Sequence, residues 1–163
     1  MLSLLQRRTI MQNKSQTFKN LEAAFAGESM ANRKYLYFAK LAREFGNEEI
    51  AKLFENTANQ ETGHAFSHLE LLYPKKDMTV AKILEIAMEG EFYETNTMYP
   101  EFEQQAVKDG DETAKEVFNE QKQESSEHHE IFLKAAKRFK VLKNVERTHA
   151  LRYQTALNSL SSK

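Results

Sequence analysis

The chain of 163 residues contains no cysteine and no tryptophan, and only five glycines and two prolines. Without cysteine it can form no disulfide and offers no thiolate for a metal, an iron–sulfur cluster or nucleophilic catalysis. The few glycines and prolines leave little room for the many tight turns of a β-sandwich. These absences favour an all-α protein in which any metal is bound by carboxylates and imidazoles.

The sequence also lacks a strong charge of one sign and a long apolar run. Its 23 basic and 24 acidic residues give a net charge of −1, so neither nucleic acid nor an anionic membrane is expected as a partner. No run approaches the roughly 20 apolar residues of a membrane span. The opening "MLSLLQRRTIMQNK" places its arginines after its apolar residues, the reverse of a signal peptide. We expect residues 1–14 to be a disordered N-terminal extension and the protein to be cytoplasmic.

What the sequence does contain is helical periodicity over most of its length. Gly46-Asn47, Pro74 and Gly110-Asp111 punctuate it, and Pro100 should kink the third helix or open one of its hydrogen bonds. Antiparallel helices joined by short turns predict an up-down four-helix bundle, with one domain over 15–163. The expected helices cover about 15–45, 48–73, 79–109 and 126–160.

Each apolar stripe is interrupted by ionisable residues. Side chains three or four residues apart share a helix face, so these residues should point into the bundle. Buried carboxylates are costly unless a cation or a metal balances them, and no lysine or arginine lies on these stripes. Two metal ions would fit this charge, with iron or manganese preferred by such donors and zinc as a possible substitute. The inward residues are Glu28, Glu61, His64, Glu91, Glu94, Glu146 and His149.

The segment "QESSEHHE" (123–130) offers a rival to the last pair, because Glu124 and His128 also share a face. Glu61 lies on the second helix at a fixed number of residues after Gly46. The residue at the same number of positions after Gly110 is Ser125, which is next to Glu124. However, a serine followed by glutamates is a common helix start. We therefore prefer Glu146 and His149, and interpret about 111–130 as a helical insertion between helices three and four. On this interpretation His128 and His129 lie at an exposed helix start, or form an extra metal or donor-docking site.

Four motifs, "AFAGESMANRKYLYFAK", "ANQETGHAFSHLELL", "EGEFYETNTMYPEF" and "VERTHALRYQTAL", resemble in order the four motif helices of the rubrerythrin family. The resemblance implies a ferritin-like fold with two iron ions that cycle between diferrous and diferric states and reduce hydrogen peroxide. Tyr35 and Tyr99 would donate hydrogen bonds to ligand carboxylates, and Glu94 and His64 would exchange on one iron. The implied ligands are Glu28, Glu61, His64, Glu91, Glu94, Glu146 and His149.

One departure concerns the electron donor. Typical members carry a rubredoxin domain whose four cysteines hold an iron, and this sequence has no cysteine. It thus resembles the rubredoxin-less erythrins or symerythrins, and we expect an NADH- or rubredoxin-linked peroxidase that takes electrons from an external donor protein such as rubredoxin. The resemblance also implies a homodimer. Two alternatives stay open: a dioxygen-reducing ferroxidase, and a metal-binding protein without catalysis.

Overall fold

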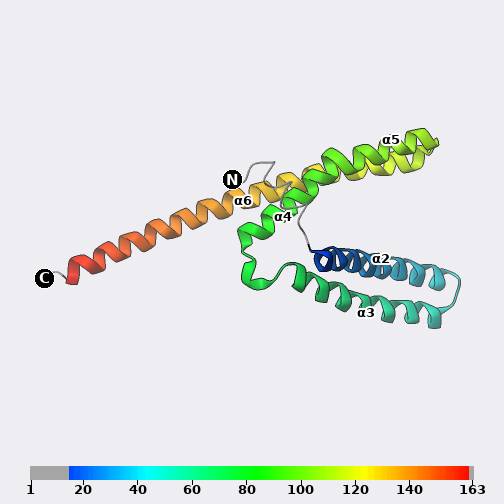
Figure 1. Cartoon of the computed structure of the whole chain (residues 1–163), viewed down its shortest axis with the longest axis horizontal. Coiled ribbons are helices and arrows are strands. Elements are labelled where there is room, and N and C mark those ends of the chain that lie inside the picture. The colour runs from blue at the N-terminus through cyan, green and yellow to red at the C-terminus, as the bar shows by residue number, and fades with distance from the viewer. Residues whose placement is uncertain (1–14, 162–163) are drawn as a thin grey trace. The chain divides into compact units, whose positions relative to one another are not determined.

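The computed structural model describes the backbone of residues 15–161 and the side chains of residues 15–140. Residues 1–14, the expected extension, lie outside this range. All regular structure over 15–161 is helical, which confirms the all-α prediction. The contacts divide the chain between Met78 and Thr79 into two compact units, each a helical hairpin (Figure 1). None of the helices described combines the length and the apolar character needed to span a membrane.

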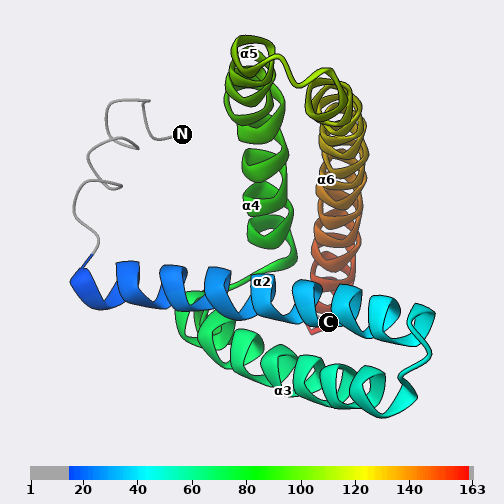
Figure 2. The same ribbon diagram turned by 90° about the vertical axis from the view of Figure 1, so that its right-hand side faces the viewer.

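The first unit pairs α2 (Gln16–Glu44) with α3 (Glu48–Leu72), which lie side by side (Figure 2). The Phe54 ring of α3 contacts Tyr35 and Phe38 of α2, with centroids 5.9 and 5.6 Å apart. Small side chains fill most of the remaining contact and let the two backbones approach closely. The buried alanines of this unit are Ala39, Ala42, Ala51, Ala58 and Ala65.

The second unit is a hairpin whose first arm has three parts and whose second arm is one long helix. Thr79 begins the first arm as its N-cap, as the sequence predicts, and accepts a hydrogen bond of 3.1 Å from the Lys82 N–H. A short 3-10 helix, η1 (Lys75–Asp77), precedes it. The elements of the unit are α4 (Val80–Tyr93), η2 (Glu94–Met98), α5 (Tyr99–Asp109) and α6 (Glu112–Ser161).

Both hairpins turn in the same way. Gly46 and Gly110 adopt left-handed conformations, with φ of 78° and 73°, which glycine tolerates best. The N–H of the next residue, Asn47 or Asp111, bonds a carbonyl five residues back at 2.8 or 2.9 Å, as in a Schellman motif. The side chains of Asn47 and Asp111 then cap the following helix. The two predicted turns are therefore present, and they place the second arm of each hairpin in the same way.

A π-helix, η2, interrupts the first arm of the second unit just before Pro100. Proline has no N–H to donate to the carbonyl four residues back, so the regular ladder cannot continue through it. Instead, the Tyr99 N–H bonds the Glu94 carbonyl, five residues back. Such π-turns often occur at functional sites. The disturbance expected from Pro100 thus takes the form of one wider turn that begins at Glu94.

The predicted separation of an insertion over about 111–130 from a fourth helix over about 126–160 is wrong, because α6 runs without interruption from Glu112 to Ser161 (Figure 1). The sequence contains neither glycine nor proline over this range, and a serine inside a helix costs only a few tenths of a kcal/mol. The polar residues that suggested a boundary find partners across the hairpin. Lys122 pairs with Glu103 of α5 at 2.6 Å, and Ser125 is buried against η2. Residues 112–130 are therefore part of the fourth helix and not an insertion before it.

Candidate metal centre

The first cluster of metal-binding side chains lies in the α2–α3 hairpin and consists of Glu28, Glu61 and His64. One ligand atom from each residue lies within 4.8 Å of the others. The His64 Nδ1 is 2.8 Å from a Glu61 oxygen and 3.8 Å from a Glu28 oxygen. Glu61 and His64 share a face of α3 because they are three residues apart, and α2 places Glu28 opposite them. The sequence predicts all three as ligands, and the structure brings them together.

Hydrogen bonds in the first cluster shift the protonation of two of its members. Hydrogen bonding with the Glu28 carboxyl, and then with the His64 ring, holds the pKa of Glu61 below its ordinary value. The hydrogen bond to Glu61 raises the pKa of His64 above its ordinary value. A proton on the His64 ring is thus favoured beside the Glu61 carboxylate, and a metal ion that binds His64 would displace it.

The second cluster forms where α4 and η2 face α6. The Ser125 hydroxyl donates to a Glu94 oxygen at 2.9 Å, and the His128 Nδ1 is 3.5 Å from a Glu91 oxygen. Tyr99 lies close enough to Glu91, Glu94 and Glu124 to respond to their charges. Partial burial, and then the charges of these carboxylates, raises the pKa of the Tyr99 hydroxyl. The second cluster is therefore Glu91, Glu94 and His128, together with Glu124, which lies one turn before His128 on α6 and whose charge acts on Tyr99.

The residues of both clusters fit divalent or trivalent metal ions. The Oε2 atom of Glu91 is buried and has no hydrogen-bond partner among the side chains described. A buried carboxylate oxygen without a partner is unfavourable, and a cation beside it removes that cost. Carboxylates with imidazoles and no thiolate are a donor set that suits iron or manganese. The unpartnered oxygen of Glu91 and the set of oxygen and nitrogen donors are both compatible with bound iron.

The two clusters also correspond in position. The number of residues from Gly46 to His64 equals the number from Gly110 to His128. In each cluster the histidine approaches one glutamate of the opposite arm, with distances of 3.8 Å to Glu28 and 3.5 Å to Glu91. Since the two turns are built alike, equal separations from them bring equivalent residues to equivalent places. Each hairpin therefore carries a cluster of similar residues at a similar position relative to its own turn.

Glu146 and His149, the predicted ligands of the last helix, lie in the part of α6 whose side chains are outside the described residues. On the uninterrupted helix, Glu146 lies about 27 Å beyond His128 at roughly 1.5 Å per residue. In the described part of the chain, His128 lies 3.5 Å from Glu91, and Glu124 lies one turn before His128 on the same helix. The sequence contained an indication of Glu124, because the residue as far after Gly110 as Glu61 is after Gly46 is the neighbour of Glu124.

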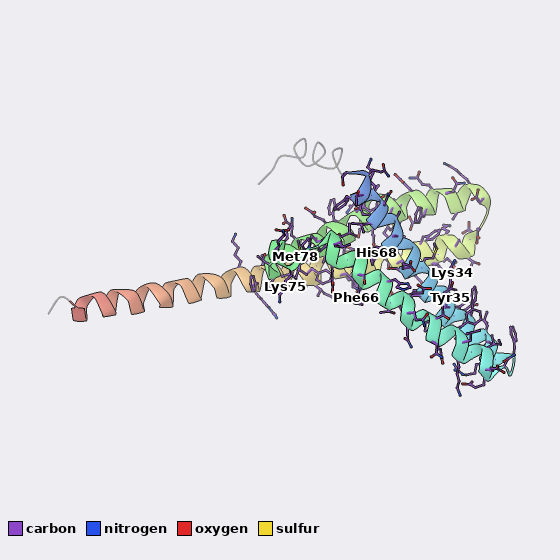
Figure 3. All side chains as sticks on the ribbon, turned by 60° about the horizontal axis from the view of Figure 1, so that its bottom comes forward. Lys34, Tyr35, Phe66, His68, Lys75 and Met78 are labelled. Carbon is purple, nitrogen blue, oxygen red and sulfur yellow. The ribbon has the colours of Figure 1, made fainter. Side chains whose placement is uncertain are left out.

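The residues expected to surround the ligands are only partly where the sequence predicts them. Tyr99 is close to the carboxylates of the second cluster. Tyr35 packs its ring on Phe54 at 5.9 Å, and its hydroxyl donates no hydrogen bond to a carboxylate within the described part of the chain. His68 lies on α3 (Figure 3), one turn beyond His64, and is not one of the three residues of the first cluster. Ser125, which donates a hydrogen bond to Glu94 of the second cluster, is a residue that the sequence did not identify as part of a site.

Helical hairpins that bring glutamates and histidines together are typical of the ferritin-like class of metalloproteins. Within that class, the chain belongs to the rubrerythrin family, whose family model, described as Rubrerythrin, matches residues 19–136. This match includes Glu124 and His128 and ends before "VERTHALRYQTAL", the segment expected from the sequence to carry the fourth motif.

Individual relatives agree with this assignment. The chain is 39% identical to nigerythrin of Nitratidesulfovibrio vulgaris, over 73% of this chain and 65% of that protein. It is 36% identical to rubrerythrin of Porphyromonas gingivalis, with the same coverage of 73% and 65%. The match thus spans less than two thirds of the length of these relatives. Among solved structures, an all-ferrous, fully reduced nigerythrin aligns with a TM-score of 0.39 at 36% identity, over 78% of this chain and 69% of that one.

Proposed function

We propose that the protein binds two iron ions and that the residues of both clusters are their ligands. The observation that carries this proposal is the correspondence of the clusters, each of which sets a histidine of the second arm against a glutamate of the first arm. Five carboxylates more than balance the charge of two ferrous ions and offset most of the charge of two ferric ions, and the two imidazoles add neutral donors. The proposed ligands are Glu28, Glu61, His64, Glu91, Glu94, Glu124 and His128.

The choice of Glu124 and His128 over Glu146 and His149 has three supports. His128 approaches Glu91, Glu124 acts on Tyr99, and the family match ends at residue 136. The four-residue spacing of Glu124 and His128 differs from the three-residue spacing of Glu61 and His64. Both spacings place the two side chains on one face of a helix, so either can serve a metal.

We further propose that the protein is an oxidoreductase that reduces hydrogen peroxide to water. Each peroxide requires two electrons and two protons to give two water molecules, and the bound iron would supply the electrons. The residues of the chain would hold protons close to the bound iron. The Tyr99 hydroxyl stays protonated beside three carboxylates, because its pKa is raised, and it can donate a hydrogen bond there. The electrons would come from a separate donor such as rubredoxin, and the active form would be a cytoplasmic homodimer.

The test is to load the protein with iron under anaerobic conditions, reduce it, and mix it rapidly with either hydrogen peroxide or dioxygen. We expect two irons per chain and faster reoxidation by peroxide, followed by optical absorption. Faster reoxidation by dioxygen would contradict the peroxidase proposal and favour a ferroxidase. Iron binding without turnover by either oxidant would leave a metal-binding protein, and failure to bind iron would contradict the centre itself.

A further inference from the structure

Ser125 is the one buried polar residue among those described, with 4% of its surface exposed. Its hydroxyl is directed across the hairpin and donates to Glu94 Oε2 at 2.9 Å. The adjacent Ser126 is exposed. A buried serine in the middle of a helix usually returns its hydroxyl to its own backbone, four residues back. Here the hydroxyl bonds a carboxylate of another helix, which requires an explanation beyond helix formation.

The comparison of the two hairpins shows what is particular about this contact. Ser125 follows Gly110 at the same separation along the chain as Glu61 follows Gly46. The second hairpin therefore carries a hydroxyl at the position where the first carries a carboxylate. It also carries an additional carboxylate on the opposite arm, Glu94, which sits at the start of the π-helix. The hydroxyl and this additional carboxylate bond to each other.

We propose that Ser125 is a positioning residue for Glu94. Its hydroxyl occupies one oxygen of the carboxylate, so that Oε1 is the oxygen directed to a metal ion. A hydrogen bond to an ionised carboxylate is stronger than one between neutral groups, and partners of this kind fix the orientation of ligating side chains. Without the hydroxyl, Glu94 is free to rotate and to present both oxygens, and the second cluster loses part of its preorganisation. This inference rests on the proposed metal binding.

The experiment compares Ser125→Ala with the matched control Ser126→Ala, which removes the same hydroxyl one residue away on the exposed side. Cobalt(II) serves as the probe, because its visible absorption reports the ligands around it without turnover. In the full-length protein, we expect Ser125→Ala to weaken one of two cobalt sites by about tenfold and to change its absorption band. Ser126→Ala should match the wild type in both respects. Ser125→Thr keeps the hydroxyl and should restore affinity and spectrum.

The outcomes separate this inference from the proposed function. Wild-type protein that binds no cobalt contradicts the metal centre and the inference with it. Two normal cobalt sites in the wild type and in Ser125→Ala leave the centre standing and overturn the role of Ser125. Equal losses in Ser125→Ala and Ser125→Thr would mean that the site needs the shape of serine and not its hydroxyl, which also overturns it. Alanine favours helices more than serine does, and circular dichroism of the metal-free variants checks the fold.

Discussion

His128 is the residue that most directly distinguishes the two parts of α6 that could bind the metals. It lies 3.5 Å from Glu91, and the same helix face carries Glu124 one turn earlier. We expect Glu124→Ala to lose about one iron per chain, because it removes a proposed ligand. Glu146→Ala should keep the full iron content and is the matched control on the same helix. The measurement is metal analysis after anaerobic loading, and a larger loss in Glu146→Ala would restore the assignment made from the sequence.

The protonation of His64 predicts how pH acts on metal binding. Its pKa is raised by Glu61, so the ring keeps its proton to higher pH than an ordinary histidine. A metal must displace that proton, so affinity should fall as the pH is lowered through the raised pKa. For the metal-free protein the sign is opposite: the His64–Glu61 contact stabilises below the ordinary histidine pKa and is lost as the pH rises through the raised one.

Calorimetry in buffers of different ionisation enthalpy counts the protons released on metal binding. We expect release near neutral pH, a smaller release in His64→Gln, and no change in His68→Gln, which alters a histidine of the same helix outside the first cluster. An affinity that stays constant between about pH 6 and 8 would contradict this account.

At the scale of the helices, the glycines of α2 and its turn should respond to substitution in opposite directions. Gly46 has φ of 78°, and an added Cβ would touch nothing within 4 Å, so only the backbone conformation opposes alanine there. Gly46→Ala should lower the free energy of unfolding by about 1 kcal/mol. Gly27, inside α2, has equally open surroundings, and Gly27→Ala should raise it by up to about 1 kcal/mol. Denaturant unfolding of the metal-free protein measures both, and changes of the same sign would show that the turn does not require a left-handed residue.

The sequence was sufficient for elements whose ends carry specific chemistry. Gly46-Asn47, Gly110-Asp111 and the cap Thr79 were predicted correctly because each signal acts through a local hydrogen bond. The prediction for Ser125 was wrong because the same hydroxyl can cap a helix or bond a distant carboxylate, and only the opposite arm distinguishes the two. The glutamates of the first three predicted helices were identified because they lie on the apolar stripes of those helices. Glu124 was rejected on the boundary signal although the count from the turn favoured it.

At the scale of the whole chain, the described residues bury few large side chains. The buried apolar residues are alanines and Leu72, whereas Phe66 and Leu71 are 61% and 65% exposed. A core of this kind contributes limited stability, and a tightly bound ligand can add a substantial share.

We therefore expect metal removal to lower the melting temperature. A ligand present at 100 times its dissociation constant stabilises the folded state by about 2.7 kcal/mol. Thermal unfolding before and after a chelator, followed by reloading with iron, measures the effect and its reversibility. Glu91→Gln, which weakens the second cluster, should show a smaller shift. Identical melting curves with and without metal would mean that the ions do not bind preferentially to the folded chain.

The π-helix keeps the two arms of the second hairpin in phase. The stretch from Glu91 to Gly110 is longer by a single residue than the stretch from Glu28 to Gly46, so the second hairpin has an extra residue between ligand and turn. In a regular helix this residue would rotate everything before it by about 100° and turn Glu91 away from α6. The wider turn at Glu94–Met98 accommodates the additional residue, so that Glu91 still meets His128. A deletion of one residue within this turn should thus remove the wider turn and leave Glu91 facing α6, whereas a deletion of one residue of α2 after Glu28 would rotate Glu28 out of its cluster.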